Sequence, residues 1–529
     1  MDSEKKHRKT GSSGKVRFIL KIIPAGIVLF SFLYLLPGCK TDQPATKPNL
    51  LFIWTDEQQA ATMGAYGIDV IRTPGLDKLA GASYVFEKCY VSQPVCSPSR
   101  ATVMTGLYPH TTGIVYNNIS LRDSTRCFPE LLDDPSYRTA YMGKWHLGDE
   151  LFAQHGFETW VSIEDGYNRF FSEGKDRDAR SSYHHWLIEK GYPPSHPDRN
   201  LFSRTYAASL PLEHSKTVFL REKACQFLEE HQDEPFILYV NYLEPHMPFT
   251  GPLDSLYPPD EVPLPENFDD PLDESEPLRY RLYREYCMEA YGSSGEEIRQ
   301  LIARYWGLVS QVDRSVGAIL DKLDSLGLTE NTIVVFTSDH GDMMGAHHLV
   351  EKQVMFEESV RVPLLIRVPT LSVDQVMIRR NISQIDLVPT LLDLMGKSVP
   401  GYLQGKSLVP LLKGEEPPEE DVFIQWNPYD FYMRWVKEDT RLATEDEIRE
   451  AVSSRTRTVV SPEGWKLCLR DSDLPQLYNL KEDPLETTNL YPDPSNRQII
   501  RSLAERIHRW QQQTGDTVTV GASGLMRKE

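Results

Sequence analysis

Cysteine and basic charge are both scarce in this sequence, and each shortage excludes a class of protein. Seven cysteines in 529 residues are too few for a disulfide framework, and no Cys-x-x-Cys pair indicates a zinc site. The 57 Lys and Arg residues are outnumbered by 76 Asp and Glu, which gives a net charge of −19. A chain this acidic is a poor candidate for general nucleic-acid binding, because that function needs a basic surface.

The composition is otherwise that of an ordinary globular protein. Apolar residues make up 40% of the chain and charged residues 25%, without internal repeats or low-complexity tracts. At roughly 100–200 residues per domain, the length allows two to four domains and at least one large buried core. Function must therefore be inferred from local motifs.

The first forty residues have the organisation of a secretory signal. An apolar run, residues 22–37, follows a basic segment and ends in small residues before a cleavage point. Its sixteen residues fall short of the ~20 that a helix needs to span a bilayer. The basic segment contains Lys5, Lys6, Arg8, Lys9, Lys15, Arg17 and Lys21.

Residues 36–39, Leu-Pro-Gly-Cys, resemble the bacterial lipobox, in which the cysteine is lipidated after cleavage. We therefore expect a lipid on Cys39 that anchors the protein to a membrane, in the periplasm or at the cell surface. An uncleaved N-terminal anchor with an incidental Cys39 is the alternative, and it also leaves the body of the protein outside the cytoplasm. Cleavage before Cys39 removes seven basic and two acidic residues, so the net charge changes from −19 to −24.

Composition and pattern divide the chain into four parts. We expect a lipoprotein signal at residues 1–38, a polar tether at 39–48, a large domain at 49–414 and a C-terminal subdomain at 415–529. Beyond residue 415 the chain carries short strand-like segments and one amphipathic helical pattern at 497–514. This pattern predicts a small antiparallel sheet packed against one helix.

Four apolar segments of the large domain predict buried strands, at residues 49–54, 137–142, 236–243 and 332–337. Helical patterns lie between them, for example at 218–231 and 297–326. Strands that alternate with long helices indicate an α/β fold, in which helices cover both faces of a large, mostly parallel sheet.

Charged side chains follow each of these strands directly. In parallel sheets, ligands bind outside the carboxyl ends of the strands, so these side chains should converge at one edge. Taken singly, an Asp or His after a strand is more often a turn residue, but four coincidences favour a site. Carboxylates are hard ligands that suit calcium or magnesium. The residues are Asp56, Glu57, Lys144, His146, His246, Asp339 and His340.

Residues 96–106 contain the most specific motif of the chain, Cys-Ser-Pro-Ser-Arg followed by Thr-Gly. This motif resembles the signature of the type I, formylglycine-dependent sulfatases, a family of the alkaline-phosphatase-like superfamily. Other segments are similar to further motifs of that family, in the same order, so the resemblance extends from about residue 49 to 492. These segments are 143–148, 245–249, 338–342, Lys352, 361–365, 476–480 and 489–490.

The resemblance implies a nucleophile and a metal. A maturation enzyme would oxidise Cys96 to formylglycine, whose hydrate attacks the sulfur of a sulfate ester. Calcium would be held by Asp56, Glu57, Asp339 and His340, together with residue 96. Two of these positions depart from the commonest pattern of the family, which has a second Asp at position 57 and often Asn at 340.

The resemblance also implies roles for the remaining residues. Arg100 would steady the hydrated aldehyde, while Lys144 and Lys352 would neutralise sulfate charge. His146 would take a proton from the second hydroxyl, so that sulfate is expelled and the aldehyde is restored. Either His246 or Lys352 would protonate the leaving oxygen.

We therefore expect an enzyme that removes sulfate from a carbohydrate, such as a glycosaminoglycan or an algal oligosaccharide. The alternative is a phosphonate or phosphate ester hydrolase of the same superfamily. A non-catalytic sugar-binding relative is a third possibility, but such a protein would have no use for a formylglycine motif. An acidic body should then enclose a small positive pocket, because charges more than ~10 Å away are screened.

Overall fold

The computed structural model describes residues 47–68, 70–372 and 374–521. The predicted signal segment and the predicted lipid on Cys39 lie outside the described residues. One compact unit begins at Lys47. Within the described part of the chain, every helix is too short or too polar to cross a lipid bilayer.

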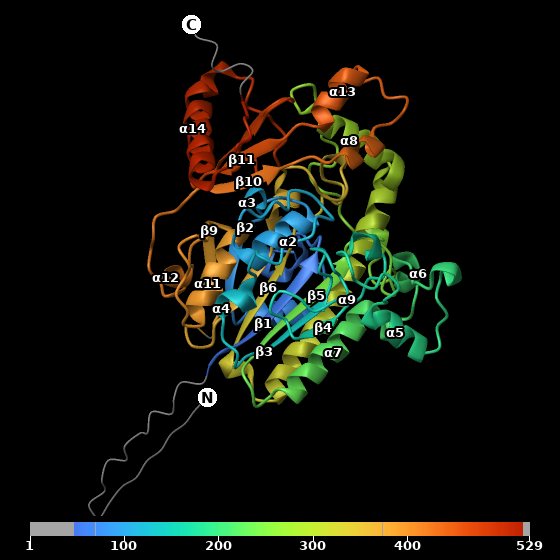
Figure 1. Ribbon diagram of the computed structural model, residues 1–529. Helices are drawn as coiled ribbons and strands as arrows, with labels where there is room; N and C mark the ends of the chain where they lie inside the picture. Colours follow the sequence, from blue (N-terminus) through green and yellow to red (C-terminus); the bar gives the residue numbers. More distant parts are fainter. Residues whose placement is uncertain (1–46, 69, 373, 522–529) are drawn as a thin grey trace, which may run out of the picture. The chain divides into compact units, whose positions relative to one another are not determined.

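A nine-stranded sheet forms the centre of this unit (Figure 1). Its first five strands are mutually parallel, and they include all four strands predicted from the sequence. Strands β8 and β7 run antiparallel to their neighbours, and β9 pairs with β2 in parallel. The order is β4 (Thr159–Val161), β3 (Arg138–Gly143), β5 (Phe236–Pro245), β1 (Asn49–Asp56), β6 (Thr332–Ser338), β8 (Leu364–Arg367), β2 (Tyr84–Tyr90) and β7 (Arg361–Val362), with β9 at Val376–Ser383.

Helices cover both faces of the sheet, as the sequence predicts (Figure 1). Alternate side chains of β1 enter two different cores, because successive residues of a strand point to opposite faces. Phe52 and Trp54 pack towards α2 (Cys96–Thr105), α4 (Phe128–Leu132) and α11 (Leu387–Leu394). Leu51 and Ile53 pack towards α1 (Pro74–Ala80), α7 (Lys216–Glu230) and α9 (Gly295–Ser325). The central strands are therefore buried on both sides.

The longest helix, α9, begins at a capping box. The Ser294 hydroxyl accepts a hydrogen bond from the Glu297 amide, and the Glu297 carboxylate accepts one from the Ser294 amide. The predicted start at residue 297 lies within this first turn. The other helices are α3 (Pro109–Thr112), α5 (Ser182–Glu189), α6 (Arg204–Ala208), α8 (Leu278–Tyr291), α10 (Glu357–Val360), α12 (Val409–Leu412), α13 (Glu445–Val452) and α14 (Arg497–Thr514).

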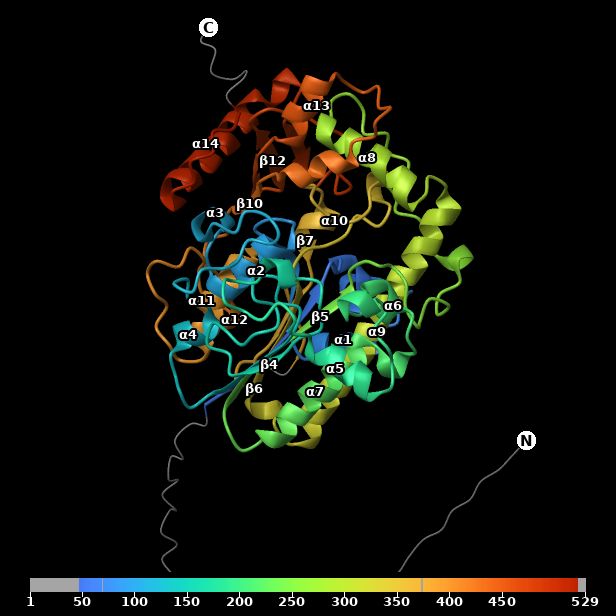
Figure 2. The ribbon, with the colours of Figure 1, turned by 45° about the vertical axis from the view of Figure 1, so that its right-hand side comes forward.

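The C-terminal part forms the predicted antiparallel sheet with its helix. The strands are β10 (Val422–Trp426), β11 (Thr456–Val460), β12 (Trp465–Arg470) and β13 (Gln476–Asn479), in that order. Helix α14 lies along this sheet, where Leu503 and Ile507 pack against Val459 and Leu467 (Figure 2). The boundary placed at residue 415 stays a prediction.

Candidate active site

The four central strands end level with one another, at a single edge of the sheet. Thr55 of β1 pairs with Ser338 of β6, and Gly143 of β3 pairs with Asn241 of β5. Gly143 has φ +113°, and a Cβ there would lie 1.8 Å from the Asn241 carbonyl oxygen. Only glycine allows this close approach, which holds the start of the following loop against β5.

Helix α2 brings Cys96 to the same edge. Cys96 is the first residue of the helix and is only 1% exposed. The next amide, that of Ser97, donates to Asn117 Oδ1 over 2.9 Å, which satisfies one of the free donors of the helix start. The Ser97 hydroxyl donates to the carbonyl oxygen of His146 over 2.6 Å. The loop after β3 is therefore tied to the helix that carries Cys96.

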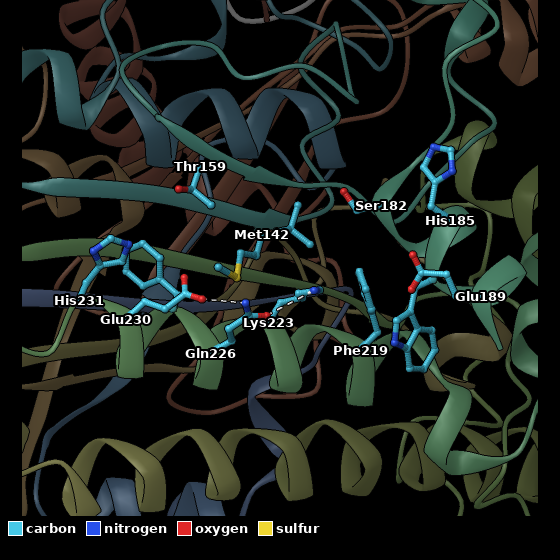
Figure 3. A pocket seen from close by; sticks show the side chains of 13 residues that line it. Met142, Thr159, Ser182, His185, Glu189, Phe219, Lys223, Gln226, Glu230 and His231 are labelled. Atoms are coloured by element: carbon cyan, nitrogen blue, oxygen red, sulfur yellow. Dashed lines mark hydrogen bonds between the residues drawn. The ribbon is translucent and has the colours of Figure 1, made fainter.

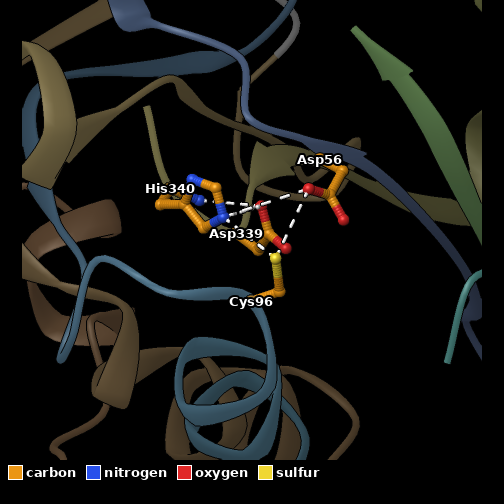
Figure 4. A group of neighbouring side chains, drawn as sticks. All are labelled: Asp56, Cys96, Asp339 and His340. Carbon is orange, nitrogen blue, oxygen red and sulfur yellow. Dashed lines mark hydrogen bonds and ion pairs between the residues drawn. The ribbon is translucent and has the colours of Figure 1, made fainter. Parts of the chain in front are cut away.

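Asp56, Cys96, Asp339 and His340 form one buried group (Figure 4). Their ligand atoms all lie within 4.8 Å of one another. His340 Nδ1 donates to the Gly341 carbonyl oxygen at 2.9 Å, so Nε2 turns its lone pair towards Cys96 Sγ, 3.3 Å away. Two carboxylates and a free imidazole nitrogen are a donor set that fits a divalent cation.

Arg100, one turn along α2 from Cys96, connects both aspartates to the loop after β3. Its Nη2 donates to Asp56 Oδ2 over 2.8 Å, and its Nε donates to Asp339 Oδ2 over 2.9 Å. Its Nη1 donates to the Lys144 carbonyl oxygen over 2.8 Å. The guanidinium also stacks 4.7 Å from the ring centre of Trp54 and is fully buried. Arg100 therefore fixes the position of the two carboxylates of the candidate cation site.

Lys144 contributes a second buried cation to the group. Its Nζ lies 2.5 Å from Asp56 Oδ2 and 3.8 Å from Cys96 Sγ. Burial alone would raise the pKa of Asp56, but Lys144, His246 and Arg100 outweigh it and hold that pKa well below its usual range. Asp56 is therefore ionised and available as a ligand at neutral pH.

The Cys96 thiol is itself poorly suited to act as a nucleophile. Burial, and after it the negative charge of Asp56, raise the pKa of Cys96 to about 12. The thiolate is the reactive form of cysteine, so this side chain is inert at neutral pH.

His146 is held by its neighbours in a left-handed backbone conformation, with φ 58°. The two carboxylate oxygens of Glu150 accept hydrogen bonds from the Trp145 amide at 2.9 Å and the His146 amide at 2.7 Å. The imidazole Nε2 lies 3.2 Å from Asn118 Oδ1 and donates to it, which leaves Nδ1 as a buried acceptor without a partner. Burial, then Lys144 and Arg100, hold the pKa of His146 well below its usual range, so the ring is neutral.

Glu57, His246 and Lys352 form a second group beside the first. Lys352 Nζ lies 2.8 Å from Glu57 Oε1 and 3.3 Å from His246 Nε2. His246 Nδ1 donates to the Met247 carbonyl oxygen at 2.9 Å, so its Nε2 accepts from Lys352. The Glu57 carboxylate pairs with Lys352 through Oε1, and a Glu57 oxygen also lies within 4.8 Å of ligand atoms of Asp56 and His246, so Glu57 as a cation ligand stays a prediction. The Glu57 amide donates to Asp339 Oδ1 over 3.1 Å.

The structure thus brings together all ten described residues that the sequence nominated. Four neighbours were not predicted: Asn118 and Glu150, which hold His146, and Tyr167 and Arg204. The Tyr167 ring centre lies 4.8 Å from that of His146, and the Tyr167 hydroxyl accepts from Arg204 over 2.8 Å. These residues lie in irregular segments and a five-residue helix, where neither periodicity nor a strand end marks them.

A surface pocket lies elsewhere, beside the edge strand β4 and between α5 and α7 (Figure 3). Its volume is about 390 Å³, and none of the nominated residues lines it. Several of its polar side chains bond to each other, as Lys223 does to Gln226 and Gln226 to Glu230. The pocket brings no nucleophile or cation site together, so the chemistry lies at the sheet edge.

Two family profiles match the sequence. The profile described as Sulfatase covers residues 48–397. The profile described as N-sulphoglucosamine sulphohydrolase, C-terminal, covers residues 345–513. Together they cover both sheets and every described residue of the candidate site.

Characterised proteins are similar over most of the chain. An ulvan-active sulfatase of Formosa agariphila is 31% identical over 428 residues, which are 78% of this chain and 74% of that protein. An N-acetylglucosamine-6-O-sulfatase of Bacteroides thetaiotaomicron is 26% identical over 95% of this chain and 94% of that protein. Among solved structures, a phosphonate monoester hydrolase of Agrobacterium radiobacter superposes with a TM-score of 0.69 at 23% identity, over 88% of this chain and 96% of that one. This last likeness concerns the fold alone.

Proposed function

The chain belongs to the sulfatase family, which hydrolyses sulfuric esters, and on that premise we propose that it removes sulfate from a saccharide by means of calcium and a formylglycine at position 96. Relatives named for ulvan and for N-acetylglucosamine 6-O-sulfate support a carbohydrate substrate. The observation that carries the proposal is the position of Cys96, at the start of α2, among Asp56, Asp339, His340 and Lys144.

The chemistry of residue 96 supports its oxidation. With a pKa of about 12, the unmodified thiol offers almost no thiolate at neutral pH, although cations surround it. An aldehyde hydrate at the same place carries two hydroxyls, so one can attack sulfur and the other can later help to expel sulfate. Formylglycine therefore supplies the nucleophile that this buried thiol cannot supply.

The proposed cation is held by Asp56, Asp339 and His340, with residue 96 adjoining. When bound, calcium polarises the sulfate oxygens and orients the ester. Arg100 donates to both aspartates, so it neutralises part of their repulsion and keeps their remaining oxygens turned towards the site. We propose this positioning role for Arg100 in place of direct contact with the hydrate, because its three described hydrogen bonds go to other atoms.

Lys144 and Lys352 supply positive charge for the sulfate group. Lys144 contacts Asp56, and Lys352 contacts Glu57. Both are buried, so their charges act in a medium of low polarity, where charge stabilisation is stronger than in water. Transferring negative charge to the leaving oxygen is thereby favoured.

Two proton transfers are assigned to the histidines and Lys352. His146 keeps Nδ1 free of partners and is neutral, which suits a base that takes the proton of the second hydroxyl. Lys352 donates to His246 Nε2, so the proton available to the leaving oxygen is carried by Lys352. His246 orients that ammonium group and can pass the proton on.

We also propose that the enzyme works outside the cytoplasm, anchored through a lipid on Cys39. Membrane fractionation tests this anchor. Cys39→Ser should abolish lipid attachment and block cleavage, whereas an uncleaved helical anchor would leave the distribution and mass of the protein unchanged.

A comparison of substrates tests the proposed reaction. Protein co-produced with a formylglycine-generating enzyme should hydrolyse an aryl sulfate, and a panel of defined sulfated saccharides then identifies the sugar and the position. Peptide mass spectrometry should find residue 96 lighter by the change from a thiol to an aldehyde. Faster hydrolysis of an aryl phosphonate or phosphate diester than of every sulfate would instead favour the phosphonate or phosphate ester hydrolase.

A further inference from the structure

Arg204 is a cation near the site that the proposed reaction does not use. Its side chain is 29% exposed, whereas the side chains of Arg100 and Lys144 are fully buried. Burial is the main reason why the pKa values of His146 and His246 are low, and the charge of Arg204 lowers both further. Arg204 lines a small pocket together with His246, and it donates to Tyr167, whose ring packs against His146, so it lies close to both histidines.

The guanidinium of Arg204 is fixed on one side only. Its Nε donates to Glu164 Oε2 over 2.6 Å, and its Nη2 donates to the Tyr167 hydroxyl over 2.8 Å. Its Nη1 donates no hydrogen bond to any described residue. A guanidinium offers five N–H donors in a rigid fork, so the two on Nη1 stay available in a fixed direction.

The charge of Arg204 is also not balanced. Glu164 forms ion pairs with both Arg204 and Lys216, so one carboxylate serves two cations. Burial would raise the pKa of Glu164, but Arg204 and Lys216 lower it to about 2, so the carboxylate is ionised. The trio itself carries one net positive charge at neutral pH, which attracts an anion. Glu244 lines the same pocket as Arg204, and because burial raises its pKa it opposes this charge less than a fully exposed carboxyl would.

Tyr167 connects the trio of Arg204, Glu164 and Lys216 to the reacting groups. The Tyr167 ring centre lies 4.8 Å from the His146 ring centre, and the Arg204 Cζ lies 6.0 Å from the Tyr167 ring centre. Arg204 and His246 also line one small pocket together with Glu244, whose pKa burial raises. A substrate that contacts His146 would therefore have Arg204 nearby, on the other side of Tyr167.

We propose that Arg204 binds a second anionic group, a carboxylate or another sulfate, on the saccharide that leaves. The proposal rests on the carbohydrate sulfatase function and specifies its substrate further. The planar fork of an arginine matches the oxygens of either anion, and the bond is charge-assisted. A sugar whose only charge is the scissile sulfate would leave these donors to water, so it should bind less tightly than sugars with a second anionic group.

The test compares substrates that differ in one charged group. N-acetylglucosamine 6-sulfate carries a single anion, glucosamine disulfate adds a sulfate, and a monosulfated disaccharide with a uronate adds a carboxylate. In Arg204→Gln, KM should rise at least ten times more for one of the two doubly charged substrates than for N-acetylglucosamine 6-sulfate. The substrate whose KM rises most identifies the anion that Arg204 binds. Arg204→Lys should restore part of the lost affinity.

Arg506→Gln is the matched control, because Arg506 has a side chain that is 27% exposed and pairs with Asp421 and Glu463 far from the site. It should leave all three KM values unchanged. The proposal would be overturned if Arg204→Gln changed KM equally for the singly and the doubly charged substrates. It would also be overturned if KM changed for none of them.

A binding measurement separates this inference from the proposed function. Wild-type enzyme that hydrolyses none of the saccharides would defeat the carbohydrate sulfatase function. Calorimetric binding of the desulfated disaccharide with its uronate tests Arg204 without any turnover. Tenfold weaker binding by Arg204→Gln supports a subsite for the carboxylate. Equal binding by the two proteins, together with equal changes of KM for glucosamine disulfate and for N-acetylglucosamine 6-sulfate, overturns the proposal.

Discussion

Replacing Arg100 by Met should destabilise the fold more than any exchange of an exposed arginine. Arg100 is fully buried and donates to two buried carboxylates, and among the described residues no other Lys or Arg pairs with Asp339. Methionine keeps the volume and the contact with Trp54 but removes the charge and all three hydrogen bonds. Asp56 keeps Lys144 as a partner, so the uncompensated charge falls mainly on Asp339.

The expected cost follows from the loss of one partner of a buried ion pair. Such losses cost about 3–5 kcal/mol, because a charge is left in a medium of low polarity. Exposed pairs contribute about 0–1 kcal/mol, so Arg506→Met is the control for the loss of any arginine. Arg100→Lys should lie between the two, since it keeps the charge but cannot reach three acceptors at once.

Guanidinium titrations followed by tryptophan fluorescence provide the measurement, on protein stripped of divalent ions by a chelator. Calcium at about 100 times its Kd should stabilise the wild-type protein by about 2.7 kcal/mol. If Arg100→Met lowers the free energy of unfolding no more than Arg506→Met does, the role that we assign to Arg100 is wrong.

Three further predictions concern the chemistry of the site. Cys96→Ala should abolish turnover and leave the free energy of unfolding within about 1–2 kcal/mol of wild type, since only one buried sulfur is lost; retained turnover would refute the nucleophile. His146 is neutral and its pKa is lowered by burial, so the acidic limb of kcat should lie below pH 6.5 and not at it; protonation of His146 is also disfavoured in the folded state, so stability should fall as the pH drops below 6.5. Glu150→Ala should lower the free energy of unfolding by about 1–3 kcal/mol for each of the two amides that lose their acceptor, and it should also lower kcat. A variant with normal kcat would show that His146 does not need Glu150 for its position.

Apolar pattern predicted the part of the fold that carries the site. Strands β1, β5 and β6 are buried on both faces, so their sequences contain continuous apolar runs that stand out from their surroundings. Strand β3 has a shorter run, Ala-Tyr-Met, after an exposed Arg138. Strands β2 and β9 escaped prediction, because β2 contains Glu87 and Lys88 and β9 contains Arg379 and Arg380. The antiparallel strand β8 has only four residues, too few for a reliable pattern.

The candidate residues could be predicted for a related reason. Side chains that directly follow a central parallel strand are brought to one edge by the sheet itself, so their sequence positions reveal their spatial neighbours. Loops bring Asn118, Glu150 and Tyr167 to the site, and the short helix α6 brings Arg204. The course of these segments depends on packing across the whole chain. The pairing of Glu57 with Lys352 was likewise unpredictable, because only side-chain packing decides between a cation and a lysine as its partner.

The burial of Cys96 sets a limit on when it can be modified during biosynthesis. Strand β1 completes its pairing only with β5 and β6, and β6 ends at Ser338, about 240 residues after Cys96. Ribosomes that add ~5–20 residues per second take roughly 12–50 s to reach that point. On the proposed function, an oxidising enzyme would have access to the thiol during this interval, because the finished protein buries it. Protein purified without its maturation partner should therefore resist activation in vitro unless it is first unfolded.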